Sequence, residues 1–316
     1  MSAPPVSSRK VAIVGTGMVG ATFAYALLQR GLASEIVLVD REKERAEGEA
    51  MDLSHGLAFV PPVRVRAGDW ADIRGSAVVA LTAGASQKPG QTRLDLLQAN
   101  AAVCRELVPR IVEAEPAATI VIATNPVDIL THLAAEVSGL PWGRVIGSGT
   151  TLDSARFRYL LGSHFGVDPR SVHAYVIGEH GDTAVPVWST AAVGGVPLDA
   201  LPRPEGRPWD DATRRRLFEE TRTAAYEIIR RKRATCYAIG LALLAVVETV
   251  LRDQRTILTV SLPVRGAHGI RDIALSLPAI VGRGGATEVL PLPLSPDEEA
   301  ALVHSARALR ARLDAL

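Results

Sequence analysis

A glycine-rich segment near the start of the chain constrains the fold more than any other feature of the sequence. The segment GTGMVG (15–20) follows an apolar run, RKVAIVG, and opens a stretch with helical spacing, MVGATFAYALLQRG. Gly15 suits a tight turn, Gly17 leaves space for a pyrophosphate beside the backbone, and Gly20 lets a helix lie close to a sheet. The helix N-terminus then offers free N–H groups and a positive dipole to phosphates. This strand–turn–helix unit predicts a dinucleotide-binding fold.

A second apolar run, EIVLVD, ends at Asp40, twenty residues beyond Gly20. A carboxylate at this place accepts hydrogen bonds from the adenosine ribose hydroxyls and repels a 2′-phosphate, so it favours NAD over NADP. The alternative is an ordinary glycine-rich turn beside a strand-terminal aspartate. The matched positions of strand, helix and acid favour the NAD interpretation.

Apolar runs and helical patterns alternate through the first half of the chain. The runs at 77–84, 117–125 and 144–149 predict further strands. Alternation implies parallel strands with right-handed crossovers, and runs that are apolar on both faces imply helices on both sides. We therefore predict an α/β fold, with a Rossmann-type doubly wound parallel sheet forming an NAD-binding domain over residues 1–148.

The pattern changes after about residue 150. VHAYVIG predicts a strand, a long helical region extends from about 209 to 252, and TILTVSLPV and IALSLPAIVG predict paired strands. An amphipathic helix with Pro296 near its start ends the chain. These elements predict an α+β substrate-binding and catalytic domain over residues 149–316.

Composition excludes several classes of function. The net charge of +1 gives no overall field for nucleic acid or anionic membranes. Two cysteines supply neither a disulfide framework nor a zinc site, so we expect no metal and a reducing compartment. The N-terminus has no apolar signal core, and the apolar stretch 237–251 is too short to span a bilayer. We therefore expect a cytoplasmic protein.

Polar side chains follow several of the predicted strands. Asn125 and Ser148 lie at or near the ends of two runs, and His180 follows VHAYVIG. Ligands of such sheets bind beyond the carboxyl ends of the strands. Asp153 and Arg156 are three residues apart, so on a helix they share one face. These residues are expected to meet in one cleft.

Their chemistry suits hydride transfer to a carbonyl. His180 can give a proton to the oxygen, because an unperturbed imidazole titrates near neutrality. Asp153 would orient the ring, and Arg156 would hold an anionic substrate through paired hydrogen bonds. Arg93, in the predicted loop GASQKPGQTRLD, would reach the carbonyl when the loop closes. Taken singly, each has a simpler explanation, namely a turn histidine, a surface helix pair or a solvated loop charge.

The combined motifs resemble the L-lactate and malate dehydrogenase family, and within it the bacterial L-lactate dehydrogenases. The matching segments are VGTGMVGATFAYALL, GEAMDLSHG, TAGASQKPGQTRLDLLQAN, ATNPVD, SGTTLDSARFRYLLG and YVIGEHGDT. The resemblance implies that His180 is the general acid/base, paired with Asp153. It implies that Arg156 binds the substrate carboxylate and that Arg93 polarises the carbonyl.

The resemblance also bears on the substrate. Lactate dehydrogenases carry glutamine at the position of Gln87, where malate dehydrogenases of the same build carry arginine. A neutral Gln87 would leave the second carboxylate of oxaloacetate unpaired, which favours pyruvate and L-lactate. Thr235 and Asn125 match residues of the substrate pocket. The rivals are a malate or bulkier 2-hydroxy-acid dehydrogenase, and a non-enzymatic NAD-binding or structural protein.

Further cofactor contacts are implied by the same resemblance. Together with the fingerprint glycines and Asp40, the expected NAD contacts are Val19, Lys43, Gly84, Ala85, Asn100, Ala123, Asn125, Ser148 and Ile239.

An effector site and an assembly are implied as well. Many bacterial relatives are activated by fructose 1,6-bisphosphate, which binds between subunits at the positions of Arg158 and His173. The alternative is an ordinary surface arginine and histidine without a ligand. The family also implies a homotetramer, with 46–56 as an interface helix. The sequence departs from the family's pattern at two positions beside Thr235. The family commonly has glycine at the position of Arg233 and an aromatic residue at the position of Cys236.

Overall fold

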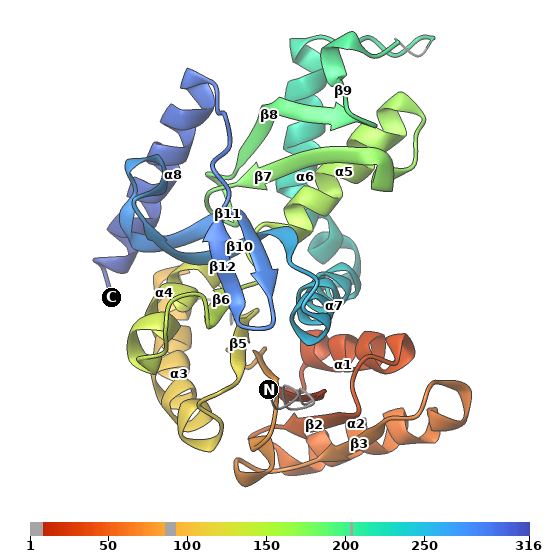
Figure 1. The fold of residues 1–316 in the computed structure, drawn as a ribbon, viewed down its shortest axis with the longest axis vertical. Helices are drawn as coiled ribbons and strands as arrows, with labels where there is room; N and C mark the ends of the chain where they lie inside the picture. Colours follow the sequence, from red (N-terminus) through yellow and green to blue (C-terminus); the bar gives the residue numbers. More distant parts are fainter. Residues whose placement is uncertain (1–8, 86–92, 203–204) are drawn as a thin grey trace, which may run out of the picture.

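The computed structural model describes residues 9–85, 93–202 and 205–316, and its centre is a nine-stranded sheet (Figure 1). In spatial order the strands are β12 (Gly285–Val289), β11 (Arg271–Gly282), β10 (Thr256–Arg265), β6 (Val145–Gly147), β5 (Thr119–Ile122), β4 (Val78–Leu81), β1 (Lys10–Val14), β2 (Glu35–Val39) and β3 (Arg64–Ala67).

The six strands from β3 to β6 are parallel and lie in the order 3-2-1-4-5-6, which is the doubly wound dinucleotide-binding arrangement. The predicted Rossmann-type fold is therefore confirmed. β10, β11 and β12 add an antiparallel extension, in which Ser261 of β10 pairs with Gly147 of β6. The predicted pairing of TILTVSLPV with IALSLPAIVG is also confirmed. The short strand β3 was not predicted, because RVRA carries little apolar signal.

Helices cover both faces of the sheet, as the strands' apolar faces require. In Figure 1 one layer lies to the left of the sheet and the other to the right. One layer holds α3 (Arg93–Ala114), α4 (Val127–Ser138) and α8 (Pro296–Leu313), and the other holds α1 (Met18–Arg30), α2 (Lys43–His55) and α7 (Tyr237–Arg252). Within the described ranges, no helix is long and apolar enough to cross a membrane.

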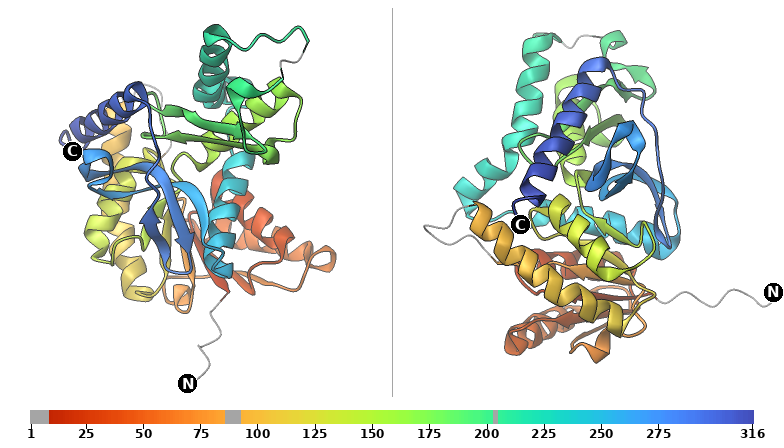
Figure 2. Two further views of the ribbon diagram at one scale, coloured as in Figure 1. Left: turned by 45° about the horizontal axis from the view of Figure 1, so that its top comes forward. Right: turned by 90° about the vertical axis from the view of Figure 1, so that its left-hand side faces the viewer.

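A smaller antiparallel sheet and two helices form a second layer of structure beside the large sheet. The smaller sheet consists of β7 (Val172–Ile177), β8 (Val185–Val193) and β9 (Val196–Pro197), packed against α5 (Thr151–Phe165) and α6 (Asp211–Lys232). Phe157 of α5 anchors this core edge-on against Trp188 at 4.8 Å and Phe218 at 6.4 Å between ring centres. Figure 2 shows α6 beside the smaller sheet and α8 along the outside of the molecule. The proposed domain boundary at 148/149 falls between β6 and α5.

The helical region predicted from about 209 to 252 consists of two helices, and the break between them was not predicted. α6 ends at Lys232 and α7 begins at Tyr237. Arg233 closes α6 in the left-handed conformation, with φ 69° and ψ −13°, and its N–H donates to the carbonyl of Ile229 at 2.7 Å. Apolar periodicity extends across such a break, because it does not report backbone dihedral angles. The C-terminal helix starts as predicted, with a capping box between Ser295 and Glu298.

Replacing Arg233 by glycine is expected to stabilise the protein. An L-residue in the left-handed conformation destabilises the folded state by about 1–2 kcal/mol, and glycine removes this strain. Glycine also makes the unfolded chain more flexible, which reduces the gain in stability by about 0.4–1 kcal/mol. We therefore expect Arg233→Gly to raise the free energy of unfolding by roughly 0.5–1 kcal/mol, measured by urea denaturation. Ala224→Gly, inside α6, is the control and should lose about 1 kcal/mol. A loss for both variants would show that the backbone at Arg233 is not strained.

Candidate active site

The glycine-rich turn joins β1 to α1 with glycines where side chains do not fit. A Cβ on Gly20 would lie 2.0 Å from the carbonyl oxygen of Gly15, so a larger residue would separate helix from sheet. Gly15 has φ 102°, a conformation that favours glycine. A Cβ on Gly17 would meet nothing within 4 Å, so the space beside it is open.

This turn fits the pyrophosphate of a dinucleotide. α1 starts at Met18, and its N-cap is Gly17, which has no side chain to occupy the helix N-terminus. The first N–H groups of an α-helix have no partner within the helix and carry a partial positive charge. Open space at Gly17 and an uncapped helix end are what a bound phosphate requires.

Asp40 faces the same turn from the end of β2. Its Oδ2 accepts hydrogen bonds from the N–H of Thr16 at 2.6 Å and the hydroxyl of Thr16 at 2.9 Å, and its Oδ1 accepts from the N–H of Glu42 at 3.0 Å. Partial burial raises the pKa of Asp40, but these hydrogen bonds outweigh it and the net pKa is lowered. Asp40 is therefore a fixed anion beside the glycine turn, and the exposed Lys43 lies one residue beyond Glu42.

The loops after β4 and β5 are joined by Asn100. Its buried side chain accepts from the N–H of Ala85 at 2.7 Å and donates to the carbonyl of Asn125 at 2.8 Å. A Cβ on Gly84 would lie 2.4 Å from Cγ2 of Thr124. Asn100 thus has both amide groups engaged within the protein, and its place in the site is to hold two loops together.

Ala123 and Ser148 lie at the same edge of the sheet. The N–H of Ala123 donates to Leu81 at 2.9 Å and that of Ser148 donates to Ile122 at 2.8 Å, which continues the parallel ladder to the strand ends. The predicted contacts from Gly15 to Ser148 therefore follow the carboxyl ends of β1, β2, β4, β5 and β6.

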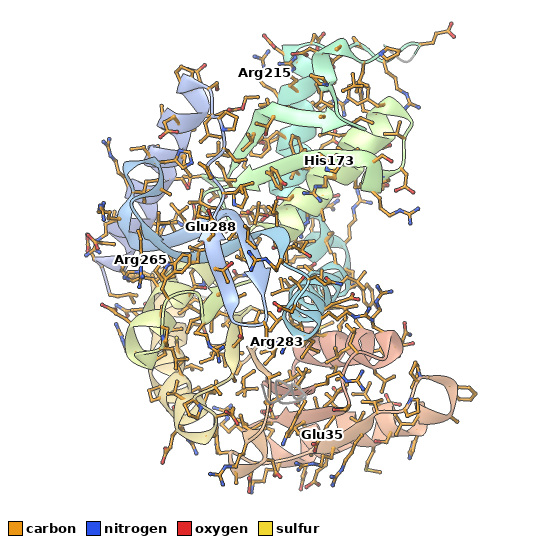
Figure 3. All side chains as sticks on the ribbon, in the orientation of Figure 1. Glu35, His173, Arg215, Arg265, Arg283 and Glu288 are labelled. Carbon is orange, nitrogen blue, oxygen red and sulfur yellow. The ribbon has the colours of Figure 1, made fainter. Side chains whose placement is uncertain are left out.

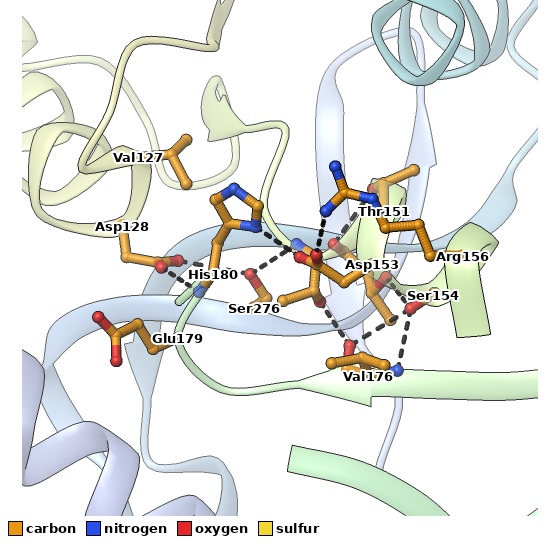
Figure 4. A network of polar contacts seen from close by, with 12 residues as sticks. Val127, Asp128, Thr151, Asp153, Ser154, Arg156, Val176, Glu179, His180 and Ser276 are labelled. Carbon is orange, nitrogen blue, oxygen red and sulfur yellow. Dashed lines mark hydrogen bonds and ion pairs between the residues drawn. The ribbon is translucent and has the colours of Figure 1, made fainter. Parts of the chain in front are cut away.

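His180 and Asp153 form a close pair (Figure 4). Nδ1 of His180 lies 2.5 Å from Oδ2 of Asp153, which joins the loop after β7 to the first turn of α5. The His180 side chain is 25% exposed while that of Asp153 is 9% exposed, so the outer ring nitrogen is the one able to meet a ligand. Sequence reasoning placed these two residues together correctly.

Arg156 completes the group. Its Nη1 donates to Oδ1 of Asp153 at 2.9 Å, so each carboxylate oxygen of Asp153 engages one partner. Within the described residues, no other guanidinium nitrogen of Arg156 makes a hydrogen bond, and Figure 4 shows the group beside His180. As far as the described residues go, one edge of the guanidinium is therefore free for an anion.

Charge within the group favours a protonated histidine. The carboxylate of Asp153 is the largest influence on His180 and raises the pKa of its imidazole, against burial, which lowers it. Burial by itself would raise the pKa of Asp153, but His180 and Arg156 outweigh this and hold it below its usual value. The arrangement is a proton donor beside an anion-binding arginine.

The other polar residues of GEHGDT anchor the His180 loop. Glu179 is buried and pairs with Arg312 of α8 and with Thr183, whose hydroxyl also lies 3.0 Å from that of Ser305. On the other side, Tyr226 of α6 donates to Asp182 at 3.1 Å. Sequence reasoning missed these anchors, because α6 and α8 are distant in the chain from residue 180.

Asp128 is a further group that sequence reasoning passed over, although it stands in the segment TNPVD. It lies in the first turn of α4, is 1% exposed and accepts the N–H of His180 at 2.7 Å. No periodicity or spacing in the sequence connects residues 128 and 180.

Several predicted residues are not joined to this group. Gln87 lies outside the described residues, as does the side chain of Arg93 at the start of α3. Thr235 is half-buried in the break between α6 and α7, and no hydrogen bond in the described part joins it to His180. Ile239 and Val19 pack on one hydrophobic cluster from α7 and α1.

Comparison with known proteins identifies relatives along the whole chain. A sequence model of the lactate/malate dehydrogenase NAD binding domain matches residues 9–147, and one of the α/β C-terminal domain of the same family matches residues 150–316. An L-lactate dehydrogenase of Moorella thermoacetica is 52% identical over 95% of both chains. One from a Thermoanaerobacter species is 47% identical over 97% of this chain and 99% of its own.

A solved structure shares the fold. The ligand-bound minor L-lactate dehydrogenase of Enterococcus mundtii superposes with a TM-score of 0.94 at 43% identity, covering 98% of this chain and 99% of its own.

Proposed function

The chain belongs to the lactate/malate dehydrogenase family, whose N-terminal domain binds NAD, and from this premise we propose that it is an L-lactate dehydrogenase interconverting pyruvate and L-lactate. The observation that carries the proposal is the contact group of His180, Asp153 and Arg156 beside the strand ends of an NAD-binding sheet.

The three residues divide the work of carbonyl reduction. The bound nicotinamide supplies the hydride. Arg156 holds the substrate carboxylate through its free edge, which fixes the carbonyl in place. His180 donates its outer ring proton to the carbonyl oxygen, and Asp153 stabilises the imidazolium before transfer and fixes the ring. In lactate oxidation the neutral His180 takes the proton back.

The remaining assignments of residues extend this mechanism. We assign Arg93 to the carbonyl oxygen and Gln87 to recognition of the methyl side of pyruvate, on family resemblance. Thr235 and Asn125 are assigned to the substrate pocket. We assign NAD to the carboxyl ends of the parallel strands, with the glycine turn at its pyrophosphate and Asp40 at its adenosine ribose.

A substrate comparison tests the function. Purified protein is assayed for NADH oxidation with pyruvate and with oxaloacetate, each with and without fructose 1,6-bisphosphate. A large preference for pyruvate supports the lactate assignment, because neutral Gln87 leaves the second carboxylate of oxaloacetate unpaired. A preference for oxaloacetate would replace it by the malate assignment. Turnover of neither would direct the search to bulkier 2-oxo acids.

Fructose 1,6-bisphosphate is the proposed activator, with Arg158 and His173 in its site. Nε of Arg158 donates to the carbonyl of Ala174 at 2.9 Å, and burial lowers the pKa of Arg158. His173 is exposed on β7 beside α5 and is labelled in Figure 3. A cation on α5 next to an exposed histidine on β7 suits a phosphate between subunits.

Activation is expected to be lost when these cations are removed. Wild-type stimulation should be about fivefold or more at low pyruvate, since coupling energies of this kind are about 1–3 kcal/mol. Arg158→Gln and His173→Gln should each abolish it, as measured from the rate against effector concentration. Arg170→Gln, an exposed arginine paired with Asp168, is the control. Full stimulation of both variants would remove Arg158 and His173 from the effector site.

We also propose a cytoplasmic homotetramer. The segment 46–56 is the expected interface, and it leaves Met51 60% exposed, followed by Phe59 at 88% exposure. Large exposed apolar side chains of this kind mark surfaces that associate. Both cysteines are unpaired and buried, as in proteins of reducing compartments. Sedimentation equilibrium measures the assembly directly.

A further inference from the structure

Asp128 is a buried acid that the proposed mechanism does not use. Its side chain is 1% exposed, yet burial of a carboxylate is costly unless hydrogen bonds or positive charge compensate. Oδ2 accepts the main-chain N–H of His180 at 2.7 Å, which is a charge-assisted hydrogen bond when Asp128 is ionised. The position in the first turn of α4 adds the positive end of a helix dipole.

Asp128 also reaches the helix that carries Asp153. The hydroxyl of Ser276 donates to Oδ1 of Asp128 over 3.4 Å and accepts the N–H of Thr150 at 3.0 Å. Thr150 is the N-cap of α5, one turn before Asp153. Ser276 is in turn held to the His180 loop by two main-chain hydrogen bonds with Gly178, of 2.8 and 2.9 Å. Figure 4 shows Ser276 between Asp128 and the start of α5.

The contacts therefore connect both halves of the proton-donating pair. One side of Asp128 fixes the backbone that carries His180, and the other side reaches the cap of the helix that carries Asp153. The contact between Nδ1 of His180 and Oδ2 of Asp153 spans 2.5 Å, so small shifts of either element would disturb it.

The charge of Asp128 also supports the proton-donating form of His180. The ionisable groups facing His180 are Asp153, Asp128 and Arg156, and both carboxylates favour the imidazolium while the guanidinium opposes it. Burial raises the pKa of Asp128 to about 6, against the hydrogen bond and charge of His180, while the neighbouring Glu179 raises it further. The N–H and the charge of His180 therefore favour the ionised form of Asp128 against its burial.

We propose that Asp128 is a positioning residue for His180: its carboxylate fixes the His180 loop against the start of α5 and, through its charge, favours the protonated imidazole. The proposal rests on the proposed dehydrogenase function, in which His180 donates the proton. Asp128 itself touches neither substrate nor cofactor in this role.

The test removes the charge and keeps the shape. In Asp128→Asn the amide oxygen can still accept the N–H of His180, but the negative charge is gone. We expect kcat for pyruvate reduction to fall about tenfold to a hundredfold, and the pH at which the rate declines to move down by on the order of one unit. Asp128→Ser is a second neutral variant, should the first fail to fold.

A direct readout comes from NMR titration of the His180 ring in the full-length protein without substrate, with the signal assigned by its loss in His180→Gln. The pKa of His180 should fall in both neutral variants. It should stay unchanged in Asp210→Asn, where the exposed carboxylate that caps α6 also accepts a main-chain N–H, that of Thr213, at 2.8 Å. An unchanged His180 titration in the neutral Asp128 variants would overturn the electrostatic role.

Ser276→Ala tests the positional role separately. It keeps the charge of Asp128 and removes the link to Thr150, so kcat should fall roughly threefold to tenfold with the His180 pKa in place. Wild-type kcat in this variant would overturn the link to α5. Because the titration needs no substrate, a wild-type enzyme inactive on pyruvate would contradict the proposed function and leave the test of Asp128 intact.

Discussion

His180→Gln is expected to lower kcat for pyruvate reduction by about 10³-fold, the largest single effect on turnover predicted for this chain. Glutamine keeps polarity at the site but has no group that can give up a proton near neutral pH. NADH binding should survive, since the glycine turn and Asp40 lie at other strand ends. Stopped-flow measurement of NADH oxidation separates the lost proton step from binding.

A matched histidine is the control for this substitution. His268 also pairs with a carboxylate, with Nδ1 2.8 Å from Glu299 of α8, but it stands in the turn between β10 and β11. His268→Gln should retain nearly full activity. Equal losses in the two variants would mean that His180 acts on stability and not on proton transfer.

The pH dependence has a defined sign. Asp153 raises the pKa of His180 above its ordinary value of 6.5, so the imidazolium persists to higher pH. Pyruvate reduction needs this protonated form, so its rate should be maximal below the His180 pKa and fall as pH rises through it. Lactate oxidation needs neutral His180 and should rise through the same interval. Two directions with the same trend would exclude His180 as the shared proton carrier.

Five of the six parallel strands were predictable because local patterns determine them, and only β3 was not. A strand buried on both faces is a short apolar run, and a glycine turn with a following helix and Asp40 identifies the nucleotide edge. In the antiparallel extension, β10 and β11 were predictable as paired strands, but β12 and the junction with β6 through Ser261 and Gly147 were not. That junction depends on packing between segments more than a hundred residues apart.

The candidate site was likewise predictable only in part. His180, Asp153 and Arg156 stand in recognisable motifs, so their meeting was expected. The contacts that support them were not expected, although Asp128 and Glu179 stand in the quoted segments ATNPVD and YVIGEHGDT. Asp128 acts through a main-chain N–H, which no side-chain pattern reports, and Arg312 reaches Glu179 from the last helix. The break at Arg233 was equally hidden, since arginine gives no local signal for a left-handed helix end.

Arg156→Lys is expected to produce the largest loss in apparent substrate affinity. Arginine presents several donors in one plane, so Nη1 can stay on Asp153 while the free edge takes a carboxylate in a paired hydrogen bond. A lysine ammonium has the same charge but a single nitrogen, which must choose between Asp153 and the substrate. Loss of such a paired hydrogen bond is expected to weaken transition-state binding by about 4 kcal/mol, which lowers kcat/KM roughly a thousandfold.

Separate measurement of KM and kcat for Arg156→Lys tests whether Arg156 binds the substrate carboxylate. Since lysine keeps a positive charge near Asp153, the His180 pH profile should move little, and most of the loss should appear in KM for pyruvate. Arg230→Lys is the control, because Arg230 pairs with Glu227 at the same three-residue spacing on exposed α6 and should lose no activity. A fall in kcat with unchanged KM would instead assign Arg156 to the orientation of Asp153, leaving the substrate carboxylate to another cation.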